Sequence, residues 1–224
     1  MKLGVLLPTF REHAQDALDV ASEAERAYLD GVFAFDHLWP MGSPLRPALA
    51  PFPVLAAVAS RCPSLYVGPL VARVGLVATA KLVEQFTTLA VLAPGRVIAA
   101  LGTGDKLSEA EQVAYDLGHL SADERRQLLA DAFDALAPLM SVWSGAGSTT
   151  TNQLARDHGA EINLWGVTPE AVRELSISGP VSWAGPLGED VERTLDELES
   201  AGATWAVAAA PLKLDRLRAW RHAH

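Results

Sequence analysis

The sequence predicts an α/β fold, a compact TIM-type (β/α)8 barrel with shortened loops, in a single domain over residues 1–224. Short apolar runs alternate with amphipathic stretches along the whole chain, which is the pattern of repeated βα units and of a parallel sheet. Several apolar runs end in glycine or in ionisable residues, as barrel strands that lead to a site do. An open doubly wound sheet built from the same units is the alternative.

The first half of the chain contains four expected strands and three expected helices. Alanine and leucine recur at helical spacing over residues 17–28, with charged residues on the opposite face. Thr79 is expected to cap the third helix, and Pro94-Gly95 forces the turn into the fourth strand. The expected strands are residues 3–7, 32–35, 65–71 and 96–101, and the expected helices are residues 14–28, 49–60 and 79–92.

The second half begins with a long polar segment, followed by a helix expected over residues 122–139. Ser121 and Glu124 have capping-box spacing for this helix. Pro169 follows Thr168 as an N1 residue follows an N-cap, which supports a later helix. The remaining expected strands are residues 142–145, 162–166, 181–185 and 204–207, and the remaining expected helices are residues 150–158, 169–175, 189–201 and 212–220.

Composition excludes several classes of function. The chain is 50% hydrophobic and 20% charged, so it can bury a large core. A net charge of -9 argues against a nucleic-acid partner, because phosphate binding needs clustered Lys and Arg. The single cysteine, Cys62, fits a reducing compartment and a structural thiol. No secretory leader precedes Lys2 and no apolar run reaches about 18 residues, so we expect a cytoplasmic protein without membrane contact.

Asp36 and His37 follow the second expected strand and are the first candidate site residues. At the C-terminal end of a barrel strand they would place a carboxylate and an imidazole beside a ligand. The imidazole can exchange a proton near neutral pH. A structural aspartate that holds a loop is the alternative interpretation.

Two glycine-rich turns are the next candidates. Gly102-Thr103-Gly104-Asp105 follows the fourth strand, where glycine lets a ring or phosphate approach the backbone and Asp105 adds a carboxylate. This turn lacks the third glycine of a dinucleotide fingerprint and the ending of a P-loop. Residues 144–149 follow the fifth strand, and their N–H groups and hydroxyls could hold a phosphate. An ordinary βα loop with a Ser/Thr cap is equally consistent with residues 144–149.

Tryptophan and histidine are the remaining residues of interest. The tryptophans at positions 39, 143, 165, 183 and 205 could wall a planar cofactor, but core packing is expected for at least half of them. The histidines other than His37 show no metal-ligand spacing with cysteine, so no metal is expected.

Four segments together resemble the bacterial luciferase-like monooxygenase superfamily. They are Lys2-Leu-Gly-Val-Leu-Leu-Pro8, Gly31-Val-Phe-Ala-Phe-Asp-His-Leu-Trp-Pro40, Pro94-Gly-Arg-Val-Ile-Ala-Ala-Leu-Gly-Thr-Gly-Asp105 and Val142-Trp-Ser-Gly-Ala-Gly-Ser148. Their order and spacing cover nearly the whole chain. The second and third segments are most similar to the branch that uses the deazaflavin coenzyme F420, with FMN as the other option.

The resemblance implies a TIM-type barrel that binds the flavin or deazaflavin ring at its C-terminal mouth and transfers hydride to or from a small organic substrate. It implies His37 and Asp105 as catalytic residues beside the ring, and Leu70 and Val71 at a strand bulge behind it. The expected cofactor-binding residues are Asp36, Leu70, Val71, Gly102, Thr103, Gly104, Gly145, Ala146, Gly147 and Ser148, the last four facing the ribityl and phosphate tail. The protein orients the ring and excludes water. A homodimer is also implied.

The chain departs from the family pattern at two places. The segment from Phe133 runs directly into the fifth strand, where relatives commonly have a long insertion that covers the substrate. Residues 75–80 replace an Arg-Pro pair at the start of the third helix. A non-catalytic flavin-binding protein, resembling the non-fluorescent flavoprotein of luminous bacteria, is therefore the alternative. A sugar- or phosphate-handling TIM barrel without redox chemistry is a third interpretation.

Overall fold

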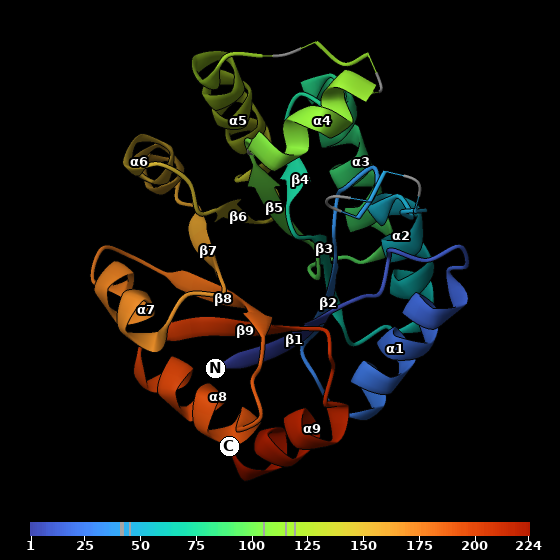
Figure 1. Cartoon of the computed structure of the whole chain (residues 1–224), viewed down its shortest axis with the longest axis vertical. Helices are drawn as coiled ribbons and strands as arrows, with labels where there is room; N and C mark the ends of the chain where they lie inside the picture. Colours follow the sequence, from blue (N-terminus) through green and yellow to red (C-terminus); the bar gives the residue numbers. More distant parts are fainter. Residues whose placement is uncertain (41–42, 45, 105, 115, 119) are drawn as a thin grey trace.

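The protein is a parallel barrel surrounded by helices (Figure 1). The computed structural model describes residues 1–40, 43–44, 46–104, 106–114, 116–118 and 120–224. Its strands form one parallel sheet in the order β3-β2-β1-β9-β8-β7-β6-β5-β4. Strand β1 (Lys2–Leu6) pairs with β2 (Gly31–Ala34) on one side and with β9 (Ala203–Ala209) on the other. The first and last strands of the chain are therefore neighbours.

The ends of this sheet meet between β3 (Tyr66–Pro69) and β5 (Ile98–Gly102). Val67 forms a parallel bridge with Val97, and its N–H donates to the Arg96 carbonyl over 2.8 Å. Strands β3 and β4 (Ala72–Arg73) are two parts of one barrel strand, separated by a cis peptide bond between Leu70 and Val71. The predicted eight-stranded barrel is confirmed, and the open-sheet alternative is wrong.

The other elements lie where apolar spacing predicts them, within a few residues at each end. They are α1 (Gln15–Arg26), α2 (Pro51–Arg61), α3 (Thr79–Leu92), α5 (Ala122–Leu136), β6 (Ser141–Gly145), α6 (Thr149–Asp157), β7 (Glu161–Trp165), α7 (Pro169–Ser176), β8 (Val181–Pro186), α8 (Val191–Ser200) and α9 (Leu214–Ala223). The capping box of Ser121 and Glu124 is present in α5. The expected Thr79 cap is wrong, because Ala78 is the N-cap and Thr79 is already helical.

Helix α4 (Lys106–Ala114) was not expected from the sequence. Among its described side chains, the buried ones are polar: Ser108, Glu111 and Gln112, at positions i, i+3 and i+4. One face of α4 is therefore turned inward, and the described side chains on that face show no apolar periodicity. The helix lies beside β4, between α5 and α3 (Figure 1).

The apolar core has two layers. A large cluster fills the space between the strands and the surrounding helices. A smaller one occupies the barrel interior, where the rings of Phe33, Trp143 and Trp205 pack with centroids 5.3–5.8 Å apart. Trp205 lies opposite Lys2 at the start of β1 and Phe33 lies opposite Leu6 at its end, so this aromatic cluster extends through the barrel interior from the N-terminal side. The C-terminal ends of the strands are left to surround a cavity.

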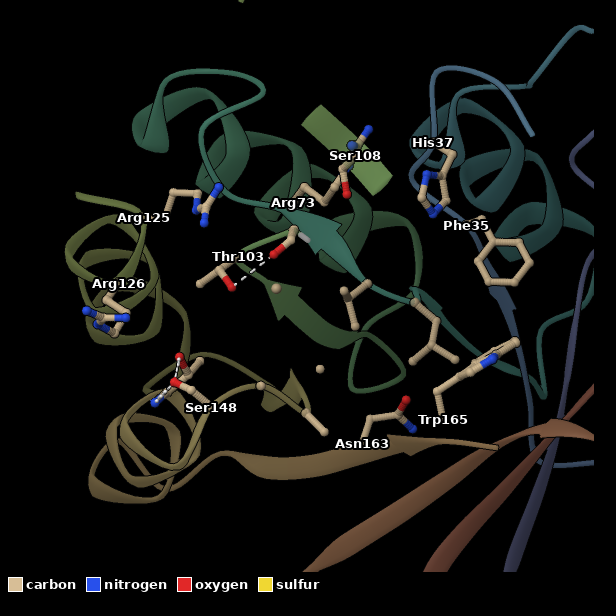
Figure 2. Close-up of a pocket in the computed structure, with 18 of the residues that line it drawn as sticks. Phe35, His37, Arg73, Thr103, Ser108, Arg125, Arg126, Ser148, Asn163 and Trp165 are labelled. Carbon is tan, nitrogen blue, oxygen red and sulfur yellow. Dashed lines mark hydrogen bonds between the residues drawn. The ribbon is translucent and has the colours of Figure 1, made fainter. Parts of the chain in front are cut away.

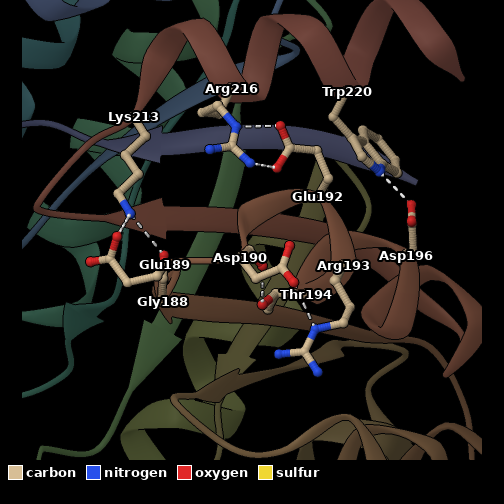
Figure 3. Close-up of polar contacts among 10 residues, drawn as sticks. All are labelled: Gly188, Glu189, Asp190, Glu192, Arg193, Thr194, Asp196, Lys213, Arg216 and Trp220. Atoms are coloured by element: carbon tan, nitrogen blue, oxygen red, sulfur yellow. Dashed lines mark hydrogen bonds and ion pairs between the residues drawn. The ribbon is translucent and has the colours of Figure 1, made fainter.

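Helices α8 and α9 are joined by exposed polar contacts (Figure 3). Arg216 pairs with Glu192, and Lys213 contacts Glu189 over 3.2 Å. No helix in the described part of the chain combines the length and apolar character needed to cross a bilayer.

Candidate active site

The C-terminal mouth of the barrel contains a cavity of about 600 Å³. Its wall includes most of the residues predicted from strand ends: His37, Leu70, Val71, Gly102, Thr103, Gly104, Gly145, Ala146, Gly147 and Ser148. Asp36 lies outside this wall and contacts Arg73, which is part of it. Asp105 lies outside the described residues. The expected convergence of distant segments on one rim is therefore present, while the roles of these residues stay predictions.

A network of charged side chains lies at one side of the cavity. The Asp36 carboxylate accepts from the Arg73 backbone N–H over 3.0 Å, and Arg73 Nε donates to the Asp36 carbonyl over 2.9 Å. Arg73 Nη2 donates to Glu111 Oε2 over 2.7 Å, and His37 Nδ1 lies 2.8 Å from Glu111 Oε1. Burial raises the pKa of Asp36, and the nearby Arg73 only partly offsets this.

Sequence reasoning missed Arg73 and Glu111. Arg73 stands between Ala72 and Val74 in an apolar run, and a lone charge in a buried strand was the available signal. Glu111 gave no such signal, because it lies in a polar stretch, and the other buried side chains described in α4, Ser108 and Gln112, are polar as well. Its partner His37 is 74 positions away in the sequence.

The opposite side of the cavity carries two arginines from the first turns of α5. Figure 2 shows Arg125 and Arg126 across the cavity from His37 and Phe35, with Ser148 below them. Arg125 Nε is buried and has no hydrogen-bond partner among the described residues. A buried guanidinium N–H without an acceptor is costly, so this atom is suited to an anionic ligand group. Arg125 and Arg126 therefore line the same cavity as residues 145–148.

Val71 projects into the space that two predicted site glycines leave open. A Cβ on Gly102 would lie 2.5 Å from Val71 Cγ2, and one on Gly145 would lie 3.3 Å from the same atom. A side chain at position 102 would displace Val71. Gly102 is thus required by the packing of the β3–β4 break, in addition to any approach of a ligand.

The loop of residues 144–149 is in part the ordinary capped loop of the alternative interpretation. Ser148 is the N-cap of α6, and its Oγ accepts from the Thr151 N–H over 3.2 Å. The Gly147 N–H donates to Asn152 Oδ1 over 2.8 Å, and the Ala146 N–H donates to the Asn163 carbonyl over 2.9 Å. These N–H groups already have protein acceptors, so the arginines of α5 are better placed to hold an anion.

Aromatic side chains line the part of the cavity next to His37. Phe10 and Phe35 stack with centroids 5.4 Å apart, and Phe35 lies 5.6 Å from Trp165 and 6.0 Å from His37. Trp165 is 49% exposed at the rim. Trp143, Trp183, Trp205 and Trp39 are buried, so the expected core role holds for more than half of the tryptophans considered. These aromatic side chains therefore lie on the His37 side of the cavity, whereas Arg125 and Arg126 lie on the other side.

Neither a metal centre nor a reactive thiol is evident in the described part of the chain. No group of three potential metal ligands occurs among the described residues. Cys62 is buried, and burial raises the pKa of its thiol, which fits the structural interpretation.

Comparison with known proteins agrees with this geometry. Residues 1–142 match the family model described as luciferase-like monooxygenase. The chain belongs to this family. It is 32% identical over 160 residues to an F420-dependent glucose-6-phosphate dehydrogenase of Beutenbergia cavernae, a match covering 70% of this chain and 46% of the relative. It is 28% identical over 183 residues to an F420-dependent hydroxymycolic acid dehydrogenase of Mycobacterium tuberculosis, covering 80% and 48%. This chain thus spans about half the length of these relatives.

A solved structure has the same fold as this chain over almost the whole length of both proteins. An F420-dependent secondary alcohol dehydrogenase in complex with an F420-acetone adduct superposes with a TM-score of 0.80 at 12% identity, covering 97% of both chains. At this identity the similarity establishes the barrel fold.

Proposed function

We propose that this protein is an oxidoreductase that transfers hydride between coenzyme F420 and a small organic substrate. The observation that carries the proposal is the cavity with two different ends. His37 and an aromatic rim lie at one end, and at the other lies Arg125, whose buried Nε has no hydrogen-bond partner among the described residues. The names of its curated relatives favour F420 over FMN.

The residues present fit the cofactor. A deazaflavin joins a flat ring to an anionic tail, and the cavity offers Leu70 and Val71 beside the aromatic rim for the ring. Arg125 would hold the tail through its Nε, with Arg126, which is already paired with Asp123, and the Ser148 hydroxyl near it. When bound, F420 supplies a ring carbon that accepts or donates a hydride.

His37 would accept the proton of the substrate hydroxyl in this reaction. Oxidation of an alcohol removes a hydride from carbon and a proton from the hydroxyl, so a base near the ring is required. His37 lies in the cavity wall with 19% of its side chain exposed, and its Nδ1 is already bonded to Glu111. The other ring nitrogen, Nε2, is therefore available to the substrate hydroxyl.

The substrate end of the cavity favours an apolar alcohol or ketone. Phe10 packs against Phe35 and His37. Figure 2 shows Phe35 and Trp165 on the His37 side of the cavity and Arg125 and Arg126 on the far side. At the His37 end, Nε and Nη2 of Arg73 are bonded to Asp36 and Glu111, and only its buried Nη1 has no hydrogen-bond partner among the described residues. The aromatic side chains therefore weigh more than this single donor in the choice of substrate. We infer that aliphatic or aromatic secondary alcohols are better substrates than sugar phosphates. Assays that compare the two classes at equal concentration test this preference.

Titration of the purified protein with F420 and with FMN, followed by the change in cofactor fluorescence, tests the proposal. We expect micromolar or tighter binding of F420, and weaker binding of FMN. Arg125→Ala should weaken F420 binding roughly tenfold or more, because it removes a charge-assisted hydrogen-bond donor. Arg216→Ala is the matched control, since it removes the same charge from the distant α8–α9 surface. Binding of neither cofactor at high micromolar concentration would end the proposal.

His37→Gln should lower kcat about 10²- to 10⁴-fold, the range that proton transfer by a positioned side chain contributes. F420 affinity should change little, because the proton-transfer role belongs to the step after binding. Steady-state turnover and cofactor titration on the same preparation separate the two effects. Turnover that is unchanged in this variant would show that His37 has no part in the reaction, and binding without any turnover in the wild type would favour the non-catalytic alternative.

A homodimer and a cytoplasmic location stay predictions. Light scattering on the purified protein measures the mass in solution, and a mass of one chain would contradict the dimer. Fractionation of native cells tests the location.

A further inference from the structure

Glu111 is buried at the cavity wall, and both of its carboxylate oxygens have partners. Oε1 lies 2.8 Å from His37 Nδ1. Oε2 accepts from the Leu38 backbone N–H over 2.8 Å and from Arg73 Nη2 over 2.7 Å. The Glu111 side chain is fully buried, and that of Arg73 is 5% exposed. The carboxylate is therefore held in one orientation by two donors on one oxygen, with the other oxygen aimed at the imidazole.

The partners of Glu111 determine where the proton of His37 lies. The contact with the Arg73 guanidinium favours the ionised carboxylate, which can only accept hydrogen bonds. His37 Nδ1 must then be the donor, and the proton of the neutral ring resides on Nδ1. Nε2 is left without a proton, as an acceptor, on a side chain that lines the cavity.

We propose that Glu111 is a positioning residue that fixes the tautomer of His37, so that Nε2 meets the substrate as a proton acceptor. The catalytic consequence rests on the proposed function, but the tautomer itself does not. The competing interpretation is that Glu111 only anchors α4 above the barrel mouth through Leu38 and Arg73. The two interpretations differ in what they predict for the imidazole.

The substitution Glu111→Gln distinguishes the two interpretations, because the two side chains have almost the same shape. The Leu38 N–H and Arg73 Nη2 remain donors, so the amide oxygen of the new side chain must face them. Its NH2 group then faces His37 Nδ1, which has to accept, and the ring proton moves to Nε2. The anchoring contacts survive, while the nitrogen that faces the cavity changes from acceptor to donor.

The test is ¹⁵N NMR of histidine-labelled protein without cofactor, because protonated and unprotonated imidazole nitrogens have well-separated shifts. Spectra are recorded at increasing pH until the His37 ring is neutral, and His37→Gln identifies its signals. We expect the proton on Nδ1 in the wild type and on Nε2 in E111Q. A wild-type ring with its proton on Nε2, or with two averaging tautomers, would overturn the proposal, as would an unchanged tautomer in folded E111Q.

Asp134→Asn is the matched control, because His158 Nδ1 lies 2.9 Å from Asp134 Oδ1 on the outer surface. It should change the His158 signals and leave those of His37 in place. With F420 bound, E111Q should lower kcat about 100-fold or more and change F420 affinity less than about threefold. Equal kcat for E111Q and wild type would contradict the catalytic part. Absence of F420 binding would instead contradict the proposed function, and the NMR result would still decide the tautomer.

Discussion

Two of the arginine–glutamate pairs in the described part of the chain have the same chemistry and different surroundings. Arg73 and Glu111, at the cavity, have side chains that are 5% and 0% exposed. Arg216 and Glu192, between α9 and α8, are 50% and 33% exposed (Figure 3). Burial removes water from both charges of the first pair, and that cost can exceed the attraction between them. The comparison suggests that the buried pair is retained for its place in the site rather than for stability.

The carboxylates around these arginines respond to their surroundings in opposite directions. At the cavity, burial raises the pKa of Asp36 despite the contact with Arg73. On the surface, the hydrogen bonds from Arg216 lower the pKa of Glu192. The contact with an arginine therefore sets the direction of the pKa shift at the exposed Glu192, whereas burial sets it at Asp36.

Arg73→Met should produce the largest effect on stability. It leaves Glu111 buried without its guanidinium and removes the donor to the Asp36 carbonyl. We expect a loss of about 3–5 kcal/mol in the free energy of unfolding, measured by urea denaturation. Adding Glu111→Gln should recover part of that loss, because it removes the unpaired charge. A loss below about 1 kcal/mol in the single variant would show that the pair is not effectively desolvated.

The pH dependence of stability should have opposite signs at Asp36 and Glu192. A raised pKa in the folded state means that the contribution of Asp36 is present below its unfolded pKa and is lost as pH rises through the folded pKa. Asp36→Asn should therefore gain stability relative to the wild type as pH rises from about 4.

The lowered pKa of Glu192 has the reverse consequence. Its contribution is present above the unfolded pKa and is lost as pH falls through the folded value. Glu192→Gln should be less stable than the wild type at neutral pH, and this difference in the free energy of unfolding should shrink as the pH falls. Denaturation series from pH 3 to pH 8 measure both trends, and slopes of the same sign in the two variants would contradict the comparison.

Arg216→Ala should produce the smallest effect. Both partners are solvated, so we expect the midpoint of thermal unfolding to fall by no more than about 3 °C, and by less in high salt. Arg193→Ala on α8 provides a second exposed arginine for calibration. If Arg216→Ala lowered the midpoint of thermal unfolding as much as Arg73→Met does, the buried and the exposed pair would no longer differ in their effect on stability.

Most of the barrel could be predicted from the sequence, because its strands and outer helices bury apolar residues with regular spacing. Helix α4 could not, since its inward face contains Ser108, Glu111 and Gln112. The reason is physical: this helix packs on a polar site rather than on the core. Apolar periodicity therefore fails at the part of the molecule closest to the proposed chemistry.

The parts of the candidate site that lie at strand ends were predictable from the sequence. The hydrogen-bonded pairs between residues far apart in the sequence were not. His37 follows its strand directly, so position along the chain was enough to find it, whereas Leu70 and Val71 were expected only from the family resemblance. The bond between Arg73 and Glu111 joins residues 38 positions apart, and the cationic side of the cavity comes from α5. Such contacts depend on how the helices pack against the barrel, and the local sequence does not determine this packing.

A crystal structure of the protein grown with F420 is the most direct test of the account. We predict that the ring lies against Leu70 and Val71 at the His37 end and that the anionic tail is bonded to Arg125. Density for the cofactor in the reverse orientation, with its tail beside Phe35 and Trp165, or a complex formed outside the barrel mouth, would contradict it.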